Sequence, residues 1–382
     1  IDEIKYLKSK GISVILTLHH FANPIWFDKK GGFKKKKYSL ERFNKYVRFV
    51  VSNLKGLVKD FCTINEPNVY AFLTFLGGCW VQQEKSWTTT RKVLINLGLC
   101  HIEAYKIIHS IIEDANVGFA MSVTKLNPER KNNIFDKLGT WFLDRRFNMA
   151  VGEFMTYGKL IFPLGLSRKK GIYIDYYGIN YYTTHTVKGF KEIIPVCSSY
   201  SDMGWPITPE QFKSVIDKYH SRYKKDIYIL ENGIADKNDT LRPKYIYDHL
   251  KVISLCECVK RYYHWSYMDN FEWKEGYGPR FGLVEYHYKD KTYTPRQSAY
   301  LYKEIIENKA VTNEMIEKYN LKNYKDFLDT QNKCERVTSD TIKEINRDVV
   351  YAIVSEAGAS IYSASLQAIE EFPDLAVEKR SA

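Results

Sequence analysis

The sequence has no long hydrophobic run and no cysteine framework. None of its apolar stretches approaches the roughly 20 residues that a transmembrane helix needs, which argues against a membrane protein. The seven cysteines are an odd number, and Cys256-Glu257-Cys258 has neither the spacing nor the second cysteine pair of a zinc site. We therefore expect reduced thiols, no bound metal and a cytoplasmic protein.

Basic charge and aromatic side chains are abundant instead. The formal net charge is +12, and the chain has 30 Tyr, 20 Phe and 7 Trp. Basic charge can indicate an acidic partner such as nucleic acid. However, the Lys and Arg residues are scattered over amphipathic stretches, and their densest run, residues 34–37, is typical of a solvated loop. Aromatic rings suit the apolar faces of sugars, although most rings pack in cores.

The chain alternates apolar, strand-like runs with amphipathic helices. After a helix at 2–9, the predicted strands lie at 12–18, 61–64, 117–123, 174–179, 226–230 and 262–268. Thr208-Pro209-Glu210-Gln211 is typical of a capping box, and it precedes a predicted helix. Apolar strands alternating with helices predict a parallel α/β fold. A (β/α)8 TIM barrel has eight strands, so we expect its first two strands to be lacking.

Two carboxylate motifs lie where predicted strands end. They are Thr63-Ile64-Asn65-Glu66-Pro67 and Ile229-Leu230-Glu231-Asn232-Gly233. A barrel builds its active site at the carboxyl ends of its strands, and two carboxyl groups in one cleft are the minimum for cleaving a glycosidic bond. Each motif alone also has a structural interpretation. Glu before Pro can simply begin a helix, and Glu-Asn-Gly can be a turn in which Gly takes a positive φ.

On these motifs the chain resembles the family 1 glycoside hydrolases, the β-glucosidase and β-galactosidase group, over about residues 1–309. The resemblance implies that Glu66 is the acid/base and Glu231 the nucleophile of a retaining mechanism. Such a mechanism has a covalent glycosyl-enzyme intermediate and carboxyl groups about 5–5.5 Å apart. It also implies a small β-glycoside or oligosaccharide as substrate, without a cofactor.

The resemblance further assigns contacts with the sugar. Asn65 would hold the 2-hydroxyl, His20 would be a sugar ligand, and Tyr182, within Asn180-Tyr181-Tyr182, would orient the nucleophile. Packing in the core is the alternative for Tyr182. The residues predicted to bind substrate are His20, Asn65, Asn180, Tyr182, Trp265, Glu272, Trp273 and Phe281.

The segment 265–273 and Phe281 would form the far end of the sugar pocket. By resemblance, Trp265 is the platform under the sugar, Glu272 and Trp273 bind the hydroxyls far from the scissile bond, and Phe281 closes the pocket. A carboxylate at position 272 would repel a phosphate, so we predict that the sugar is unphosphorylated.

The two expected missing strands and the carboxyl-terminal tail leave alternatives open. In the family, those strands bring a sugar-binding Gln and an Arg beside the nucleophile, so a catalytically inactive sugar-binding fragment is the second hypothesis. Residues 310–348 are predicted to be a helical tail and linker. Residues 349–382 resemble part of the RNase H-like region of Tex-type transcription accessory proteins, which bind RNA. At roughly 34 residues this piece is too short to bury its own core, so a nucleic-acid function is the weakest hypothesis.

Overall fold

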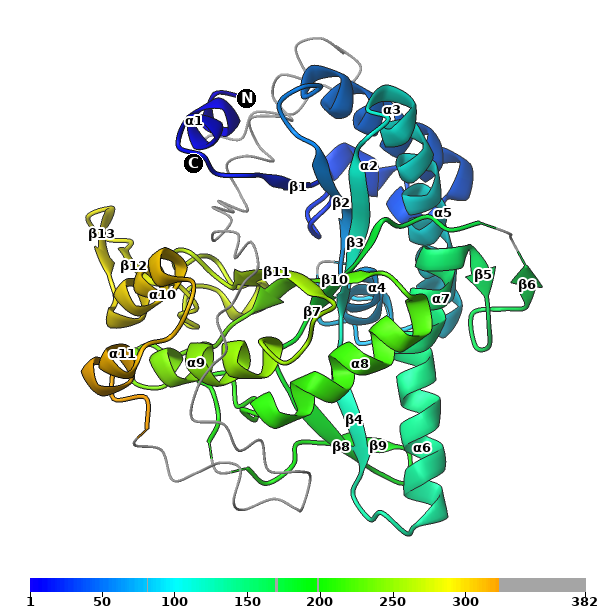
Figure 1. Cartoon of the computed structure of the whole chain (residues 1–382). Helices are drawn as coiled ribbons and strands as arrows, with labels where there is room; N and C mark the ends of the chain where they lie inside the picture. Colours follow the sequence, from blue (N-terminus) through cyan, green and yellow to red (C-terminus); the bar gives the residue numbers. More distant parts are fainter. Residues whose placement is uncertain (81, 169–170, 198, 323–382) are drawn as a thin grey trace. The chain divides into compact units, whose positions relative to one another are not determined.

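The computed structural model describes residues 1–80, 82–168, 171–197 and 199–322 (Figure 1). The predicted segment 349–382 and most of 310–348 lie outside the described residues. The chain divides into two compact units. Unit 1 contains Ile1–Ser122 and Arg145–Gly178, and unit 2 contains Val123–Asp144 and the described residues from Ile179 onward.

Unit 1 is built on parallel strands with helices packed beside them. Strands β1 (Ile15–Thr17), β2 (Asp60–Asn65) and β3 (Asn116–Ser122) pair in that order, and both pairs are parallel. All six residues of β2 are buried, because the strand is covered on both faces. Strand β7 (Tyr176–Asn180) begins in unit 1 and ends in unit 2.

Helix α3 (Lys36–Asn53) shows why the apolar spacing forms a helix in unit 1. Phe43, Val47, Val50 and Val51 recur at helical spacing and are all buried. Helix α3 packs beside α5 (Trp87–Ile111) (Figure 1). The other elements of unit 1 are α1 (Asp2–Ser9), α2 (Ile25–Lys29), η1 (Gly32–Lys34), α4 (Pro67–Phe75), η2 (Arg145–Met149), α7 (Ala150–Tyr157), β5 (Lys159–Leu160) and β6 (Ser167–Arg168).

Unit 2 continues the strand–helix alternation. Strand β10 (Asp226–Asn232) pairs in parallel with β11 (Val259–His264). A small sheet contains β4 (Lys125–Pro128), β8 (Thr184–Lys188) and β9 (Lys191–Ile193), with β8 between the other two. The other elements are α6 (Ile134–Asp144), η3 (Pro209–Gln211), α8 (Phe212–Tyr223), α9 (Arg242–Ile253), η4 (Trp273–Glu275), β12 (Val284–His287), β13 (Thr292–Pro295), α10 (Gln297–Asn308) and α11 (Asn313–Lys318).

The predicted α/β fold is confirmed, with six strands in the main parallel sheet of the described residues. A complete barrel has eight. Among the described residues, no helix is both long and apolar enough to cross a bilayer. Within the same ranges, no group of three or more His, Cys, Asp or Glu side chains is placed to hold a metal ion.

Three local predictions differ from the structure. Strand β1 is shorter than the predicted 12–18. The strand predicted at 262–268 begins at Val259 and ends at His264, after which Met268 pairs with Val284 instead. The capping box at Thr208 does not form. The Thr208 hydroxyl accepts no hydrogen bond from a backbone N–H of the following helix, and it donates to Thr184 Oγ1 (3.0 Å).

Candidate active site

Glu66 lies in unit 1 at the junction of β2 and α4, in a left-handed backbone conformation. Its φ of 41° and ψ of 60° cost a non-glycine residue about 1–2 kcal/mol. The Glu66 N–H donates to the carbonyl of Ala120 (2.8 Å), and the Glu66 carbonyl accepts from Tyr70 N–H (3.0 Å). The side chain is 7% exposed. Such strain at a buried carboxylate motif is a feature of functional sites.

Asn65 and His20 contact each other beside Glu66. Asn65 Nδ2 donates to His20 Nε2 (3.1 Å), and the Asn65 N–H donates to the carbonyl of His19 (2.8 Å). Desolvation by burial and, to a smaller extent, the neighbouring His19 together lower the pKa of His20 to about 3. His20 is therefore neutral at pH 7 and accepts at Nε2, so its other ring nitrogen, Nδ1, carries the proton. A protonated Nδ1 can donate to a hydroxyl.

His19, the neighbour of His20, belongs to a polar network behind it. His19 Nε2 contacts Asn23 Oδ1 (3.2 Å), while Asn23 Nδ2 donates to Tyr70 Oη (2.8 Å) and Asp28 Oδ1 (3.3 Å). Burial lowers the pKa of His19 to about 4 and raises that of Asp28 to about 6. Sequence reasoning missed this network, since no local spacing links Asn23 to Tyr70.

Glu231 lies in unit 2 near the end of β10, within reach of a phenol. Tyr182 Oη donates to Glu231 Oε2 (2.6 Å), and the Tyr181 N–H donates to the Glu231 carbonyl (3.0 Å). The Glu231 side chain is 8% exposed. A short hydrogen bond to an ionised carboxylate is among the stronger polar contacts in proteins. It fixes the orientation of this carboxylate.

Two aromatic rings fix Tyr182 in turn. Trp205 and Phe281 approach its ring edge-on, with centroid distances of 5.6 and 6.2 Å, and they lie 6.2 Å from each other. Phe281 was predicted at this site, whereas Trp205 was not. Trp205 lies in an irregular loop, so it belongs to no periodic pattern that sequence reasoning could use.

Asn232 anchors the end of β10 on the face opposite Glu231. Its Nδ2 donates to the carbonyl of Tyr181 (2.7 Å) and to Tyr245 Oη (2.9 Å), and Tyr262 Oη donates to its Oδ1 (2.9 Å). The residue is fully buried. These three bonds join β10 to its neighbours and to α9, so they restrict the position of Glu231.

Gly233 is required by close approach and not by a left-handed turn. It is absent from the residues with positive φ among those described, which overturns the turn interpretation for this glycine. A Cβ at position 233 would lie 1.7 Å from the carbonyl oxygen of Trp265. The Trp265 N–H also donates to the Asn232 carbonyl (2.9 Å). The motif therefore brings the Trp265 backbone against the end of β10.

A buried ion pair shapes the segment that leads to Glu272 and Trp273. Arg296 binds Asp269 with both terminal nitrogens (3.1 and 2.9 Å), and Gly282 N–H donates to Asp269 Oδ1 (2.9 Å). The Glu272 N–H donates to the carbonyl of Gly276 (2.7 Å), and Trp273 is left-handed with φ 48°.

The predicted site residues fall into two groups. His20, Asn65 and Glu66 belong to unit 1, whereas Tyr182, Glu231, Trp265, Glu272, Trp273 and Phe281 belong to unit 2. Asn180, also in unit 2, is fully buried, and its carbonyl accepts from Val123 N–H (2.9 Å). The roles predicted for these residues stay predictions.

Parallel strands with carboxylates at their carboxyl ends are the architecture of a barrel glycosidase. The model of glycosyl hydrolase family 1 matches residues 2–159 and 170–311, and the chain belongs to this family. A second model, the Tex protein YqgF-like domain, matches residues 292–382. The predicted Tex resemblance is thus confirmed, over a wider range than 349–382.

Several relatives are similar over most of this chain. The β-galactosidase of Saccharolobus solfataricus is 30% identical, over 81% of this chain and 70% of the relative. The chloroplastic galactolipid galactosyltransferase SFR2 of Arabidopsis thaliana is also 30% identical, but only 50% of its length is covered.

Solved structures show the same similarity. The β-glycosidase of Pyrococcus horikoshii has a TM-score of 0.78 at 34% identity, covering 84% of this chain and 78% of that one. The family 1 β-glucosidase of Thermotoga maritima in complex with isofagomine lactam has a TM-score of 0.74 at 26% identity, covering 81% and 77%.

Proposed function

We propose that the chain is a retaining β-glycosidase that hydrolyses terminal, unphosphorylated β-D-glucosyl or related β-glycosyl residues. The observation that carries the proposal is the carboxylate of Glu231, held by Tyr182 at 2.6 Å within the Glu-Asn-Gly motif. The names of relatives support the substrate class, since they include β-galactosidases and a β-glucosidase from Acetivibrio thermocellus that is 30% identical.

In the proposed mechanism, Glu231 and Glu66 act in two steps. Glu231 attacks the anomeric carbon while the bond to the leaving oxygen breaks, and Glu66 gives that oxygen its proton. The product is a covalent glycosyl-enzyme ester. Water then attacks the same carbon, Glu66 takes the proton of the water, and Glu231 leaves as a carboxylate. The two inversions give net retention.

The proposal of an unphosphorylated sugar depends on Glu272. A sugar 6-phosphate beside this carboxylate would place like charges close together, which is unfavourable. Trp265, whose backbone is fixed against the end of β10, is the proposed platform under the sugar ring.

A chromogenic assay with p-nitrophenyl β-D-glucoside, β-D-galactoside and β-D-glucoside 6-phosphate tests these statements. We expect release from the first two and little from the third. Glu231→Ala should lower kcat by at least about 10³-fold, as the loss of a nucleophile does. Added azide should restore turnover and give the α-glycosyl azide, because it attacks from the face that Glu231 occupied.

Glu66→Ala should give the opposite stereochemistry with azide. In this variant the glycosyl-enzyme still forms from an activated aryl glycoside, so azide attacks the ester and gives the β-glycosyl azide. Glu257→Ala, at an exposed glutamate, is the matched control and should keep normal activity. Full activity of Glu231→Ala without azide would overturn the nucleophile assignment.

The other hypotheses predict different results. Sugar binding without any turnover in the unmodified chain would favour the inactive sugar-binding fragment. A nucleic-acid function, which the match of residues 292–382 to a Tex domain model supports, predicts salt-dependent RNA binding that is lost when residues 349–382 are deleted.

A further inference from the structure

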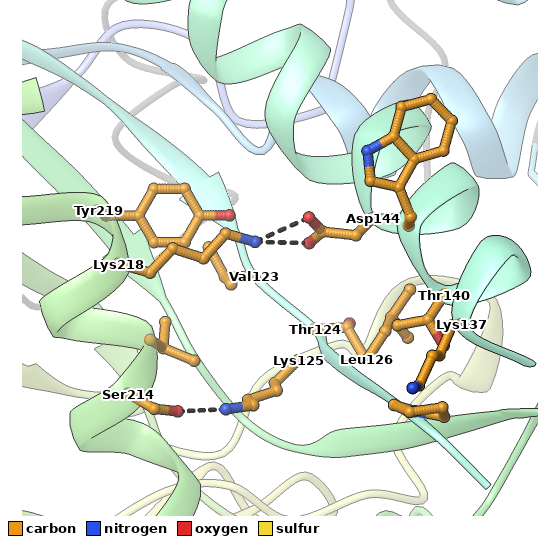
Figure 2. Close-up of a pocket in the computed structure, with 13 residues that line it drawn as sticks. Val123, Thr124, Lys125, Leu126, Lys137, Thr140, Asp144, Ser214, Lys218 and Tyr219 are labelled. Carbon is orange, nitrogen blue, oxygen red and sulfur yellow. Dashed lines mark hydrogen bonds and ion pairs between the residues drawn. The ribbon is translucent and has the colours of Figure 1, made fainter. Parts of the chain in front are cut away.

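Unit 2 contains a cavity of about 290 Å³ between α6 and α8, with β4 at its base (Figure 2). None of its lining residues belongs to the candidate active site. Each helix contributes side chains at helical spacing. Lys137, Trp141 and Asp144 lie on α6, and Ser214 and Lys218 lie on α8, so each set forms one wall.

An ion pair and a hydrogen bond hold the polar side chains of the cavity. Lys218 Nζ donates to both carboxylate oxygens of Asp144 (2.9 and 2.7 Å), which connects the two helices (Figure 2). Lys125, on β4, donates to the Ser214 hydroxyl across the other side of the cavity. Lys137 lines the same cavity.

The lining combines net positive charge with apolar surface. It contains three lysines, Lys125, Lys137 and Lys218, and one carboxylate, Asp144, which gives a net charge of 3 − 1 = +2. Leu126 and Val215 supply apolar surface, and Trp141 also lines the cavity although its side chain is 55% exposed. A volume of about 290 Å³ lies near the lower end of the range for small-molecule sites.

We propose that this cavity binds a small amphipathic anion, namely an aryl or alkyl carboxylate. The hydrocarbon part lies against Trp141, Leu126 and Val215, and the carboxylate accepts hydrogen bonds from Lys125 and Lys137. A neutral ligand of the same shape would keep the apolar contacts and lose the contacts between charges. Nothing in this site depends on the proposed glycosidase activity.

Isothermal titration calorimetry of the full chain with 2-naphthoate and its neutral isostere 2-naphthamide tests the proposal. We expect 2-naphthoate to bind at least fivefold more tightly than 2-naphthamide. Lys125→Gln and Lys137→Gln should each weaken 2-naphthoate binding by roughly two- to fivefold, the range measured for partly exposed ion pairs. Trp141→Ala should weaken both probes, and Lys55→Gln, at an exposed lysine outside the cavity, should change neither.

The variant Asp144→Asn tests whether Asp144 affects ligand binding through its charge or by maintaining the shape of the cavity. Removing this charge releases Lys218 from its ion pair and raises the net charge of the lining to +3. We therefore expect 2-naphthoate to bind roughly two- to fivefold more tightly, whereas damage to the cavity would weaken it.

Three results would overturn the proposal. They are absence of 2-naphthoate binding up to about 5 mM, equal affinity for the two probes, and weaker 2-naphthoate binding to an Asp144→Asn variant whose affinity for 2-naphthamide is unchanged. The comparison of the two probes uses the unmodified chain, so it stays decisive even if a variant fails to fold. Because no turnover is read, this outcome is separate from that of the glycosidase assay.

Discussion

Replacing Gly233 by alanine tests whether the end of β10 is shaped by close approach. The new Cβ would lie 1.7 Å from the Trp265 carbonyl oxygen, whereas ordinary contacts begin at 3.4 Å. The two backbones must therefore separate by roughly 3.4 − 1.7 = 1.7 Å. Rotation of a side chain cannot relieve this clash, because the Trp265 oxygen belongs to the backbone.

The energetic consequence follows from the hydrogen bonds at this point. The Trp265 N–H donates to the Asn232 carbonyl at 2.9 Å, and separation of the backbones breaks this bond. An unsatisfied buried group costs about 1–3 kcal/mol. Displacement of the backbone also strains Asn232, because its three side-chain hydrogen bonds hold it in place. We therefore expect a loss of about 2–5 kcal/mol in the free energy of unfolding.

Urea unfolding and the glycosidase assay together provide the measurement. Gly278→Ala is the matched control, since its Cβ would meet only the Glu275 carbonyl at 3.6 Å. The variant Gly233→Asn distinguishes close approach of the Trp265 backbone from a requirement for a left-handed turn at position 233. Asparagine tolerates a left-handed backbone, so it would rescue a positive-φ turn, but it meets Trp265 as alanine does. An unfolding free energy of Gly233→Ala within about 0.5 kcal/mol of the parent would refute the reasoning.

Three further predictions concern single contacts. Tyr182→Phe removes the donor to Glu231 and should lower kcat/KM by about 10- to 100-fold, the kinetic equivalent of a hydrogen bond to a charge. Burial raises the pKa of Asp28 to about 6, so the folded state binds this proton more tightly than the unfolded state. The contribution of Asp28 to stability therefore falls as pH rises from about 4 to 6, and Asp28→Asn should remove that contribution from the pH dependence of urea unfolding. Arg296→Met removes the closer ion-pair partner of the buried Asp269 and leaves only Arg280 at 3.4 Å, so it should cost up to about 3–5 kcal/mol in thermal unfolding.

Two of these predictions have a comparison variant, and all three have a contrary outcome. Tyr267→Phe, at an exposed tyrosine, should keep full activity, and equal activity of Tyr182→Phe would remove the role of its hydroxyl. An unchanged pH slope in Asp28→Asn would show that another group titrates. Asp269→Leu combined with Arg296→Met should be less destabilising than Arg296→Met alone, and a larger loss would contradict the ion-pair explanation.

The positions of the two Glu motifs could be predicted because they depend on local signals. Buried parallel strands are nearly continuous apolar runs, so Phe61–Ile64 and Ile227–Leu230 mark β2 and β10, and the polar residues after them mark the strand ends. Helix α8 could be predicted for the same reason, since its apolar residues recur at the helical period.

The failures share a cause in contacts that are distant in sequence. Residues 265–268 are apolar enough to extend β11, but the strand ends at His264 and Met268 pairs with Val284 instead. Residues 208–211 have the sequence of a capping box. However, the Thr208 hydroxyl donates to Thr184 Oγ1, and the Thr208 carbonyl accepts from the Tyr181 hydroxyl. No spacing within either segment contains this information.

The two carboxylate motifs place their neighbouring asparagines by different means. Successive side chains of a strand point to opposite faces, so Asn232 is turned away from Glu231 and forms its three bonds in the interior. At β2 the order is reversed, with Asn65 before Glu66, and the left-handed backbone of Glu66 breaks the alternation. Asn65 contacts His20, a residue predicted to bind sugar, instead of anchoring the strand. The strain at Glu66 thus accompanies an asparagine whose side chain contacts His20, whereas the unstrained end of β10 has an asparagine that joins β10 to its neighbours.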